Sequence, residues 1–222
     1  MERVICLLIG YVFGLFQTAY IYGRLHGIDI RNYGSGNAGT TNTLRVFGTK
    51  AGLLVLFGDI MKCILAVVIT GVIFKNTHGD EVYLLKMYAA AGAIIGHNFP
   101  FYLKFKGGKG IAATAGLILS FHPYLIPMGL ILFFGAFFTT HYVSLGSLLV
   151  YAGFFVELVI LGQMDVLGMT QPLLNEMYVI AGILTVMAYW KHRENIKRLL
   201  SGTERKTYLT HKNKEEKDKA ES

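Results

Sequence analysis

The stretch IAATAGLILSFHPYLIPMGLILFFGAFFT, residues 111–139, decides how this chain is arranged. It is apolar and long enough for one membrane span, yet its centre contains His122 and Pro123, which are typical of a turn. If this stretch is one helix, three spans lie between the basic loop at residues 104–110 and the basic segment from residue 191 onward. If it is two helices, four spans lie between them. The charges of the loops on either side choose between these interpretations.

The composition indicates an integral membrane protein. Of the 222 residues, 53% are hydrophobic and only 16% are charged, against about 25% charged in typical globular proteins. Besides residues 111–139, apolar segments of spanning length predict helices over residues 4–23, 51–74, 83–103, 144–161 and 173–190. We interpret the first as a retained span, because no convincing signal-peptide cleavage site follows it.

The basic residues mark one side of the membrane. Lys and Arg are concentrated in residues 24–50, in residues 104–110 and from residue 191 onward, whereas residues 162–176 contain neither. By the positive-inside rule the basic segments are cytoplasmic and residues 162–176 are external. An even number of spans must then separate residues 104–110 from the C-terminus, so residues 111–139 split. The sequence predicts an all-α integral membrane protein with seven transmembrane helices, some short, an external N-terminus and a cytoplasmic C-terminus.

The split leaves residues 111–121 too short to cross the bilayer alone, at about 16 Å as a helix. Short membrane segments that begin with glycines are tolerated where they line a site. We therefore expect a site on the cytoplasmic side, next to this segment. The chain is interpreted as a single transmembrane domain over residues 1–205, followed by a charged, disordered cytoplasmic tail over residues 206–222.

The segment NYGSGNAGTTNTLRVFG, residues 32–48, predicts a phosphate site. Closely spaced glycines let successive backbone N–H groups converge on an anion, and a helix that starts near Gly39 adds its positive end. Arg is the preferred side chain for bidentate phosphate binding. A flexible loop with glycines for turns is the alternative. The expected contacts are Ser35, Asn37, Thr41 and Arg45.

The segment GHNFPFYLKFKGGKGIAAT, residues 96–114, predicts a second phosphate cradle. It is not a nucleotide-binding P-loop, because the first glycine of that motif would fall at Leu103 and its Ser or Thr at Gly110. The alternative, a topology signal, explains the lysines but not the glycines. His97 is either a structural hydrogen-bonding residue or a catalyst. The candidate phosphate ligands are Lys104, Gly107, Gly108 and Lys109.

A third polar segment, YWKHRENIKRLLSGTE at residues 189–204, follows the last span. On a helix, His192, Asn195 and Leu199 share one face, and an amphipathic interfacial helix is the alternative interpretation. Ser144 opens the span at residues 144–161 on the same side of the membrane, where a small hydroxyl is also typical of a helix cap.

Other polar residues within the spans are interpreted as structural. Asp59 and Lys62 lie three residues apart on one helix and can pair. Cys6 and Cys63 fall in apolar runs and lack metal-ligand spacing, and no carboxylate cluster stands out. The sequence predicts neither a metal nor a cofactor.

The three segments, in their order and spacing, resemble the bacterial membrane acyl-phosphate:glycerol-3-phosphate acyltransferase family, PlsY, across residues 1–205. The resemblance implies a seven-span enzyme in the inner (plasma) membrane with its active site facing the cytoplasm. It implies transfer of a fatty acyl group from acyl phosphate to the 1-hydroxyl of glycerol 3-phosphate. The products are 1-acyl-glycerol 3-phosphate (lysophosphatidate) and inorganic phosphate, in the first step of phospholipid synthesis. It also implies no metal, no cofactor and no covalent acyl-enzyme.

By position, the resemblance assigns phosphate binding to the candidate residues of the first two segments, and it adds Glu204 to the substrate-binding residues. Its candidate catalytic residues are His192, Asn195, Ser144 and His97. The general base stays open between His192, His97 and an oxygen of the acyl phosphate. His141 departs from the family pattern, in which arginine is common, and this weakens one phosphate contact at neutral pH.

The expected partners are acyl phosphate, glycerol 3-phosphate and membrane lipids, with no nucleic acid, and the expected state is a monomer. Acyl-CoA is not the expected donor, because no histidine is followed by the Asp of a His-x4-Asp pair. A phosphate or phospholipid transporter is the alternative function. A transporter needs substrate sites near the membrane midplane and usually internal repeats, and the sequence shows no repeat.

Overall fold

The computed structural model describes residues 1–208, and within that range all regular secondary structure is helical. Residues 209–222, most of the predicted tail, lie outside the described residues. The helices are α1 (Glu2–Gly14), α2 (Thr18–Leu25), α3 (Thr40–Phe47), α4 (Thr49–Phe74), α5 (Val82–Asn98), α6 (Ile111–Phe121), α7 (Leu125–Thr140), α8 (Val143–Gln163), α9 (Gln171–Lys191) and α10 (Arg193–Leu200), with 3-10 turns η1 (Ile30–Asn32), η2 (Gly79–Glu81) and η3 (Phe101–Leu103).

Four of the described segments are long and apolar enough to cross a membrane. They are α1 together with α2 (Glu2–Leu25), α4, α8 and α9, while α6 and α7 are shorter apolar helices. Their outer surfaces stay apolar, because Val72 on α4 is 73% exposed and Val186 on α9 is 70% exposed. Such a surface suits contact with hydrocarbon rather than water. The expected all-α membrane-type architecture is therefore confirmed.

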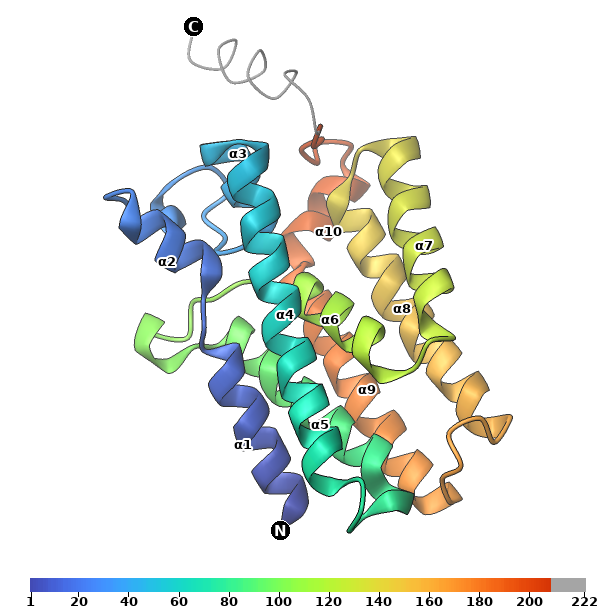
Figure 1. Ribbon diagram of the computed structural model, residues 1–222. Coiled ribbons are helices and arrows are strands. Elements are labelled where there is room, and N and C mark those ends of the chain that lie inside the picture. The colour runs from blue at the N-terminus through green and yellow to red at the C-terminus, as the bar shows by residue number, and fades with distance from the viewer. Residues whose placement is uncertain (209–222) are drawn as a thin grey trace, which may run out of the picture.

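The split of residues 111–139 is also confirmed. Helix α6 ends at Phe121, and α7 begins at Leu125 after the turn that contains His122 and Pro123. Figure 1 shows that this turn lies part-way along the bundle and does not reach the end where the N-terminus lies. The two helices thus form a hairpin, in which α6 is largely buried and α7 lies on the outer surface of the bundle.

The first apolar segment is not the single continuous helix that its composition predicts. Helix α1 ends at Gly14, and α2 begins at Thr18. The buried side chain of Gln17 lies at the break, where its Nε2 donates to the carbonyls of Gly14 (3.0 Å), Gly96 (3.2 Å) and His97 (3.2 Å). These bonds satisfy carbonyls at the end of α1 and join the break to the end of α5.

Helices α1 and α5 pack with their backbones in close contact through small residues. A Cβ added to Gly10 would lie 1.9 Å from the carbonyl oxygen of Ala89, and one added to Gly96 would lie 2.4 Å from that of Tyr11. Such spacing of glycines is the usual way in which membrane helices approach closely. The contact fixes α5, and with it the polar residues that follow α5, relative to the N-terminal helix.

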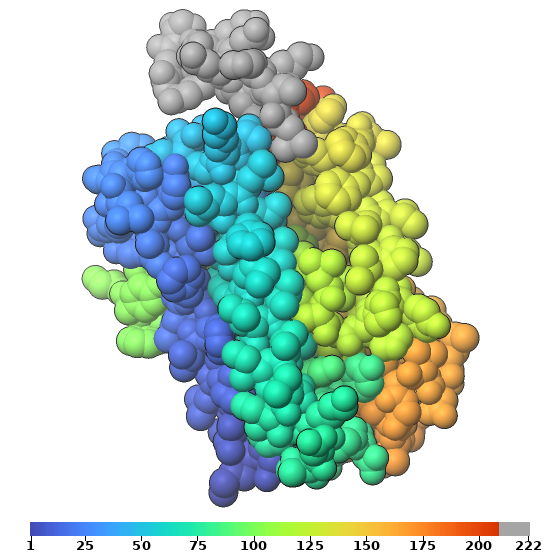
Figure 2. Space-filling model, viewed as in Figure 1, coloured from blue at the N-terminus to red at the C-terminus, as the bar shows by residue number. Residues whose placement is uncertain are grey.

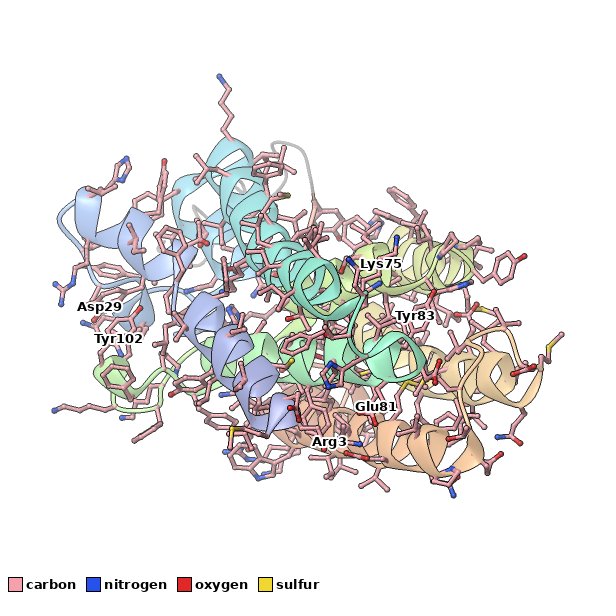
Figure 3. All side chains as sticks on the ribbon, turned by 60° about the horizontal axis from the view of Figure 1, so that its bottom comes forward. Arg3, Asp29, Lys75, Glu81, Tyr83 and Tyr102 are labelled. Carbon is pink, nitrogen blue, oxygen red and sulfur yellow. The ribbon has the colours of Figure 1, made fainter. Side chains whose placement is uncertain are left out.

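A polar cluster closes the bundle at its N-terminal end. The guanidinium of Arg3 donates to both carboxylate oxygens of Glu176 (2.6 and 3.1 Å) and to Glu81 (3.2 Å), and the hydroxyl of Tyr88 donates to Glu176 (2.7 Å). Arg3 and Glu81 are labelled side by side in Figure 3. The cluster joins α1, η2, α5 and α9.

The opposite end of the bundle holds α3, α10 and the turn between α7 and α8 (Figure 1). Helices α4 and α7 stand apart there, and Figure 2 shows the molecular surface hollowed between them. The core below is built from buried apolar side chains of α5, α6, α8 and α9. This end carries the three polar segments.

Candidate active site

A cavity of about 430 Å³ lies among the three polar segments that the sequence singles out. Its walls come from residues 34–45, 109–112 and 191–205, together with His97 on α5 and Ser144 on α8. These segments are far apart in the chain, and the fold brings them to one place. The three polar segments thus converge on one cavity at one end of the bundle.

Four helices begin at the cavity wall. The first residues of α3, α6, α8 and α10 all line it, and none of the four helices has a side-chain cap hydrogen bond at its N-terminus. The first N–H groups of a helix have no partner within the helix, and its N-terminus carries a partial positive charge. The backbone alone therefore makes this cavity attractive to anions such as phosphate.

Cationic side chains add to this potential. Burial and the nearby charge of Arg198 together lower the pKa of Lys109 to about 8. The charges of Arg198 and Lys109 repel each other because the two groups lie close together. An anion bound beside them would therefore be stabilised by several cations at once. The cationic side chains that line the cavity are Arg45, Lys109, Lys191, Arg193, Arg198 and Arg205.

The first segment lies as predicted. Helix α3 begins at Thr40, next to the expected Gly39, and the cavity is lined by Ser35, Asn37, Thr41 and Arg45. The residue that shapes this loop is Asn42, which directly follows the candidate Thr41. Its Oδ1 accepts from the backbone N–H of Ser35 (2.7 Å), and its Nδ2 donates to the carbonyls of Ile30 (3.1 Å) and Tyr33 (3.0 Å).

The second segment differs from the prediction at three of its four candidate residues. Lys104 is exposed and does not line the cavity, because the turn η3 carries it to the outside of the bundle. The N–H groups of Gly107 and Gly108 donate to the carbonyls of Asn98 (3.3 Å) and His97 (3.1 Å). They are therefore not available as a phosphate cradle, and only Lys109 reaches the cavity.

The two glycines instead allow close packing. A Cβ on Gly108 would lie 2.1 Å from Nε2 of His97 and 2.9 Å from the carbonyl oxygen of Ala38. No side chain fits between the first segment and His97. The glycines thus hold the first and second segments together, and the anion-binding backbone comes from the start of α6 that follows them.

His97 is held by a buried ion pair. Nζ of Lys62 donates to Oδ1 of Asp59 (2.8 Å), to the carbonyl of Phe16 (2.9 Å) and to Nδ1 of His97 (2.8 Å). An ammonium has no acceptor, so Nδ1 must be the acceptor and the ring proton is assigned to Nε2. The predicted pairing of Asp59 with Lys62 is confirmed. With this tautomer, the free ring nitrogen of His97 is a hydrogen-bond donor.

In the third segment, the carboxylate of Glu204 gathers three donors. Oε1 accepts from the Ser144 hydroxyl (2.9 Å) and from Nδ2 of Asn195 (2.6 Å), and Oε2 accepts from Nε of Arg198 (2.7 Å). Lys109 donates in turn to Oδ1 of Asn195. Burial raises the pKa of Glu204, but the bonds from Asn195, Arg198 and Ser144 outweigh it and leave the pKa below its usual value.

Glu204, which the resemblance places among the substrate-binding residues, does not suit a direct contact with phosphate. Its oxygens already accept three hydrogen bonds, and a carboxylate repels an anion. It positions Ser144, Asn195 and Arg198 around the cavity. On α10 the cavity is lined by Arg198 and not by Leu199. The position of Arg198, three residues after Asn195, is the sequence signal that could have found it.

His192 lies between α9 and α10 with the opposite tautomer to His97. Its Nδ1 lies 2.8 Å from the carbonyl oxygen of Ala188, which can only accept, so Nδ1 carries the proton and Nε2 is an acceptor. Burial and the charge of Lys109 lower the pKa of His192 to about 4. The imidazole is therefore neutral at physiological pH.

Comparison with known proteins identifies the family. The family model described as glycerol-3-phosphate acyltransferase matches residues 4–202. The chain belongs to this family. It is 42% identical to a glycerol-3-phosphate acyltransferase of Halalkalibacterium halodurans over 93% of this chain and 96% of the relative. It is 38% identical to one of Mycoplasmopsis synoviae over 92% and 94% of the two chains.

Solved structures agree. The crystal structure of PlsY, an integral membrane glycerol 3-phosphate acyltransferase, in its glycerol 3-phosphate form has a TM-score of 0.80, with 28% identity over 94% of this chain and 96% of that chain. A lysophosphatidic acid form of PlsY has a TM-score of 0.77 and 27% identity. The chain is thus an acyltransferase of the PlsY family, whose members serve phospholipid biosynthesis, and the resemblance seen in the sequence is confirmed.

Within residues 1–208, no group of three or more His, Cys, Asp or Glu side chains is arranged to hold a metal ion.

Proposed function

We propose that this acyltransferase moves a fatty acyl group from acyl phosphate to the 1-hydroxyl of glycerol 3-phosphate. The products are 1-acyl-glycerol 3-phosphate (lysophosphatidate) and inorganic phosphate. The observation that carries the proposal is the cavity in which four uncapped helix starts and six cationic side chains converge. Membership of the glycerol-3-phosphate acyltransferase family supports the identity of the acceptor.

The charge of the cavity supports a second phosphorylated substrate. Six cationic and three acidic side chains line it, which leaves three positive charges before the helix starts are counted. One phosphate ester brings about −1.5 to −2 at neutral pH, so two bring about −3 to −4. A single phosphate would leave the cavity with excess positive charge, whereas two phosphates match it. This balance favours acyl phosphate as the donor over a thioester that places no phosphate beside the reacting carbonyl.

The proposed reaction is a direct transfer. The 1-hydroxyl oxygen attacks the acyl carbon, the bond from that carbon to the phosphate oxygen breaks, and inorganic phosphate leaves. Lys109 and the start of α6 stabilise the negative charge that develops, and binding both substrates in one cavity supplies their proximity. Ser144 is not a nucleophile in this scheme, because the lowered pKa of Glu204 makes that carboxylate a poor base for its hydroxyl.

The proton of the hydroxyl passes to a phosphate oxygen. Burial and the charge of Lys109 lower the pKa of His192 to about 4, so its imidazole is a weak base, and the phosphate carries oxygens that can accept the proton. His192 accepts a hydrogen bond from the hydroxyl at Nε2 and orients it. Asn195 holds Lys109 beside the reacting groups.

We also propose the membrane arrangement that the loop charges predict. The seven spans are α1 with α2, then α4, α5, α6, α7, α8 and α9, within one domain over residues 1–205, and the enzyme acts as a monomer in the inner (plasma) membrane. The N-terminus is external, and the cavity faces the cytoplasm. This assignment is supported by the position of the basic residues of α3 and α10 at the end opposite the N-terminus (Figure 1).

The test is an assay of the purified protein in detergent with radiolabelled glycerol 3-phosphate and palmitoyl phosphate. We expect a labelled lipid product and an equal amount of inorganic phosphate, and no lipid product when palmitoyl-CoA replaces palmitoyl phosphate. Uptake of labelled glycerol 3-phosphate into liposomes without any lipid product would refute the enzyme and support the transporter.

A further inference from the structure

The side chain of Arg45 is held by a part of the chain that the three polar segments do not include. Arg45 lies in the last turn of α3 and lines the cavity. Its Nη2 donates to the hydroxyl of Thr207 (2.9 Å) and lies 3.4 Å from the carbonyl oxygen of Arg205. The family model ends at residue 202, so both partners lie beyond it. We call residues 204–208 the C-terminal strap.

The strap spans the gap between two walls of the cavity. On one side, Nη1 of Arg205 lies 3.5 Å from the carbonyl oxygen of Gly34 in the first segment. On the other side, the N–H of Thr207 donates to the carbonyl of His141 (2.9 Å) in the turn between α7 and α8. Thr207 is only 2% exposed. A buried hydroxyl anchored through its own backbone is a rigid acceptor, unlike a threonine on a free chain end.

The chemistry of the contact favours a positioning role. An arginine side chain has many rotamers, and its use in binding phosphate depends on the direction of the guanidinium plane. An acceptor that holds one Nη before substrate arrives removes that freedom in advance. Glu204, in the same strap, does the same for Ser144, Asn195 and Arg198. The strap thus acts on both the first and the third segment.

We propose that Thr207 is a positioning residue for Arg45, and that the C-terminal strap is an integral wall of the active site. The inference rests on the proposed function, because it assigns Thr207 to the binding of a phosphorylated substrate through Arg45. Thr207 touches no substrate in this scheme. Its hydroxyl orients the guanidinium that does.

The test compares Thr207→Val, which removes the hydroxyl at nearly constant shape, with Thr207→Ser, which keeps it. Thr203→Val is the matched control, because Thr203 is an exposed residue just before the strap whose side chain bonds only Ser201 among the described contacts. A chain that ends at Lys206 removes Thr207 but keeps Glu204, and serves if Thr207→Val folds poorly. Each is assayed with both substrates, and folding is followed by thermal unfolding in detergent.

We expect Thr207→Val and the shortened chain to lose about tenfold in kcat/KM, the usual effect of one lost hydrogen bond to a charged group. The loss should appear in the same KM that Arg45→Lys raises, and Thr207→Val should add little to Arg45→Lys. Thr207→Ser should stay within about twofold of wild type, as should Thr203→Val.

Equal activity of wild type and a folded Thr207→Val would overturn the proposal, and so would an equal loss in the Arg45→Lys background. Failure of Thr207→Ser to restore activity would also overturn it. A wild-type protein that makes no lipid product would instead overturn the proposed function itself, so the two failures are distinguishable.

Discussion

Replacing Glu204 by Gln tests whether this carboxylate positions the cavity wall or contacts substrate. The carboxylate accepts from the Ser144 hydroxyl, from Asn195 and from Arg198. A glutamine has one acceptor oxygen and one amide donor, so it can keep two partners at most, and its NH2 must face at least one other donor. The shape is conserved, which makes the hydrogen bonds the variable.

The expected loss follows from the bond to Arg198. A hydrogen bond to a charged group contributes about 1.5–3 kcal/mol to the free energy of unfolding. The Arg198 side chain is 39% exposed, and solvent weakens its bond, so we use about 2 kcal/mol. If this energy holds Arg198 and Asn195 in place for the reaction, kcat/KM falls by about thirtyfold. The same energy should lower the unfolding temperature by about 4–8 °C for a chain of this size.

The opposite result is expected if Glu204 contacts a phosphate, as the sequence first indicated. Removal of a negative charge would then strengthen the binding of an anion and lower KM. Glu194→Gln is the control, because it removes a charge from the same wall at a side chain that is 56% exposed. Phosphate release from palmitoyl phosphate gives kcat and KM for both variants, and thermal unfolding gives their stability. A Glu204→Gln protein with wild-type unfolding temperature and unchanged or lower KM would refute the positioning role.

The pH dependence supplies a second check on Glu204. Its pKa in the folded protein lies below the ordinary 4.5, because its hydrogen bonds outweigh the effect of burial. A carboxyl group with a lowered pKa contributes stability that is fully present above about pH 4.5 and is lost as the pH falls through the lowered pKa. The unfolding temperature of wild type should therefore fall more steeply below pH 4.5 than that of Glu204→Gln.

Three further predictions concern the other polar segments. Since the pKa of Lys109 is lowered to about 8, KM for the phosphorylated substrates should rise above pH 8 as its charge is lost, and Lys109→Met should flatten that rise. His97→Leu removes one acceptor of the buried Lys62 ammonium, whereas His97→Asn keeps an acceptor. The unfolding temperature of His97→Leu should therefore lie several degrees below that of His97→Asn. Equal unfolding temperatures would contradict the tautomer assigned here. Gly108→Ala should lower activity at least tenfold, because a Cβ would lie 2.1 Å from Nε2 of His97, whereas Gly135→Ala, with nothing within 4 Å, should leave activity and stability intact or improved.

The sequence was informative where one local signal settles the structure. The turn at His122 and Pro123 follows from loop charges and from the chemistry of proline, and it lies where expected. The start of α3 follows from Gly39 and the threonines after it. Asp59 and Lys62 pair because three residues separate them on one helix, a spacing that needs no tertiary information.

The sequence failed where partners come from distant segments. Nothing near Gln17 indicates a helix break, because the carbonyls that its amide satisfies belong partly to α5. Gly107 and Gly108 resemble an anion cradle locally, yet their N–H groups are used by the end of α5. Lys104 has the right charge but lies after a turn whose direction only the fold sets. Glu204 gathers donors from α8 and α10, so its role is visible only in three dimensions.

The polar cluster at the N-terminal end has a consequence for how the bundle is assembled. Arg3 and Glu176 are separated by 173 positions in the chain, and they join the first long helix to the last. The ribosome has made α1 to α8 before Glu176 emerges, so this pair forms after those helices have been made. Until then the amino-terminal helix lacks its acidic partner on α9. The contact therefore acts as a closing step in biogenesis, and it is made at the end of the bundle that does no chemistry.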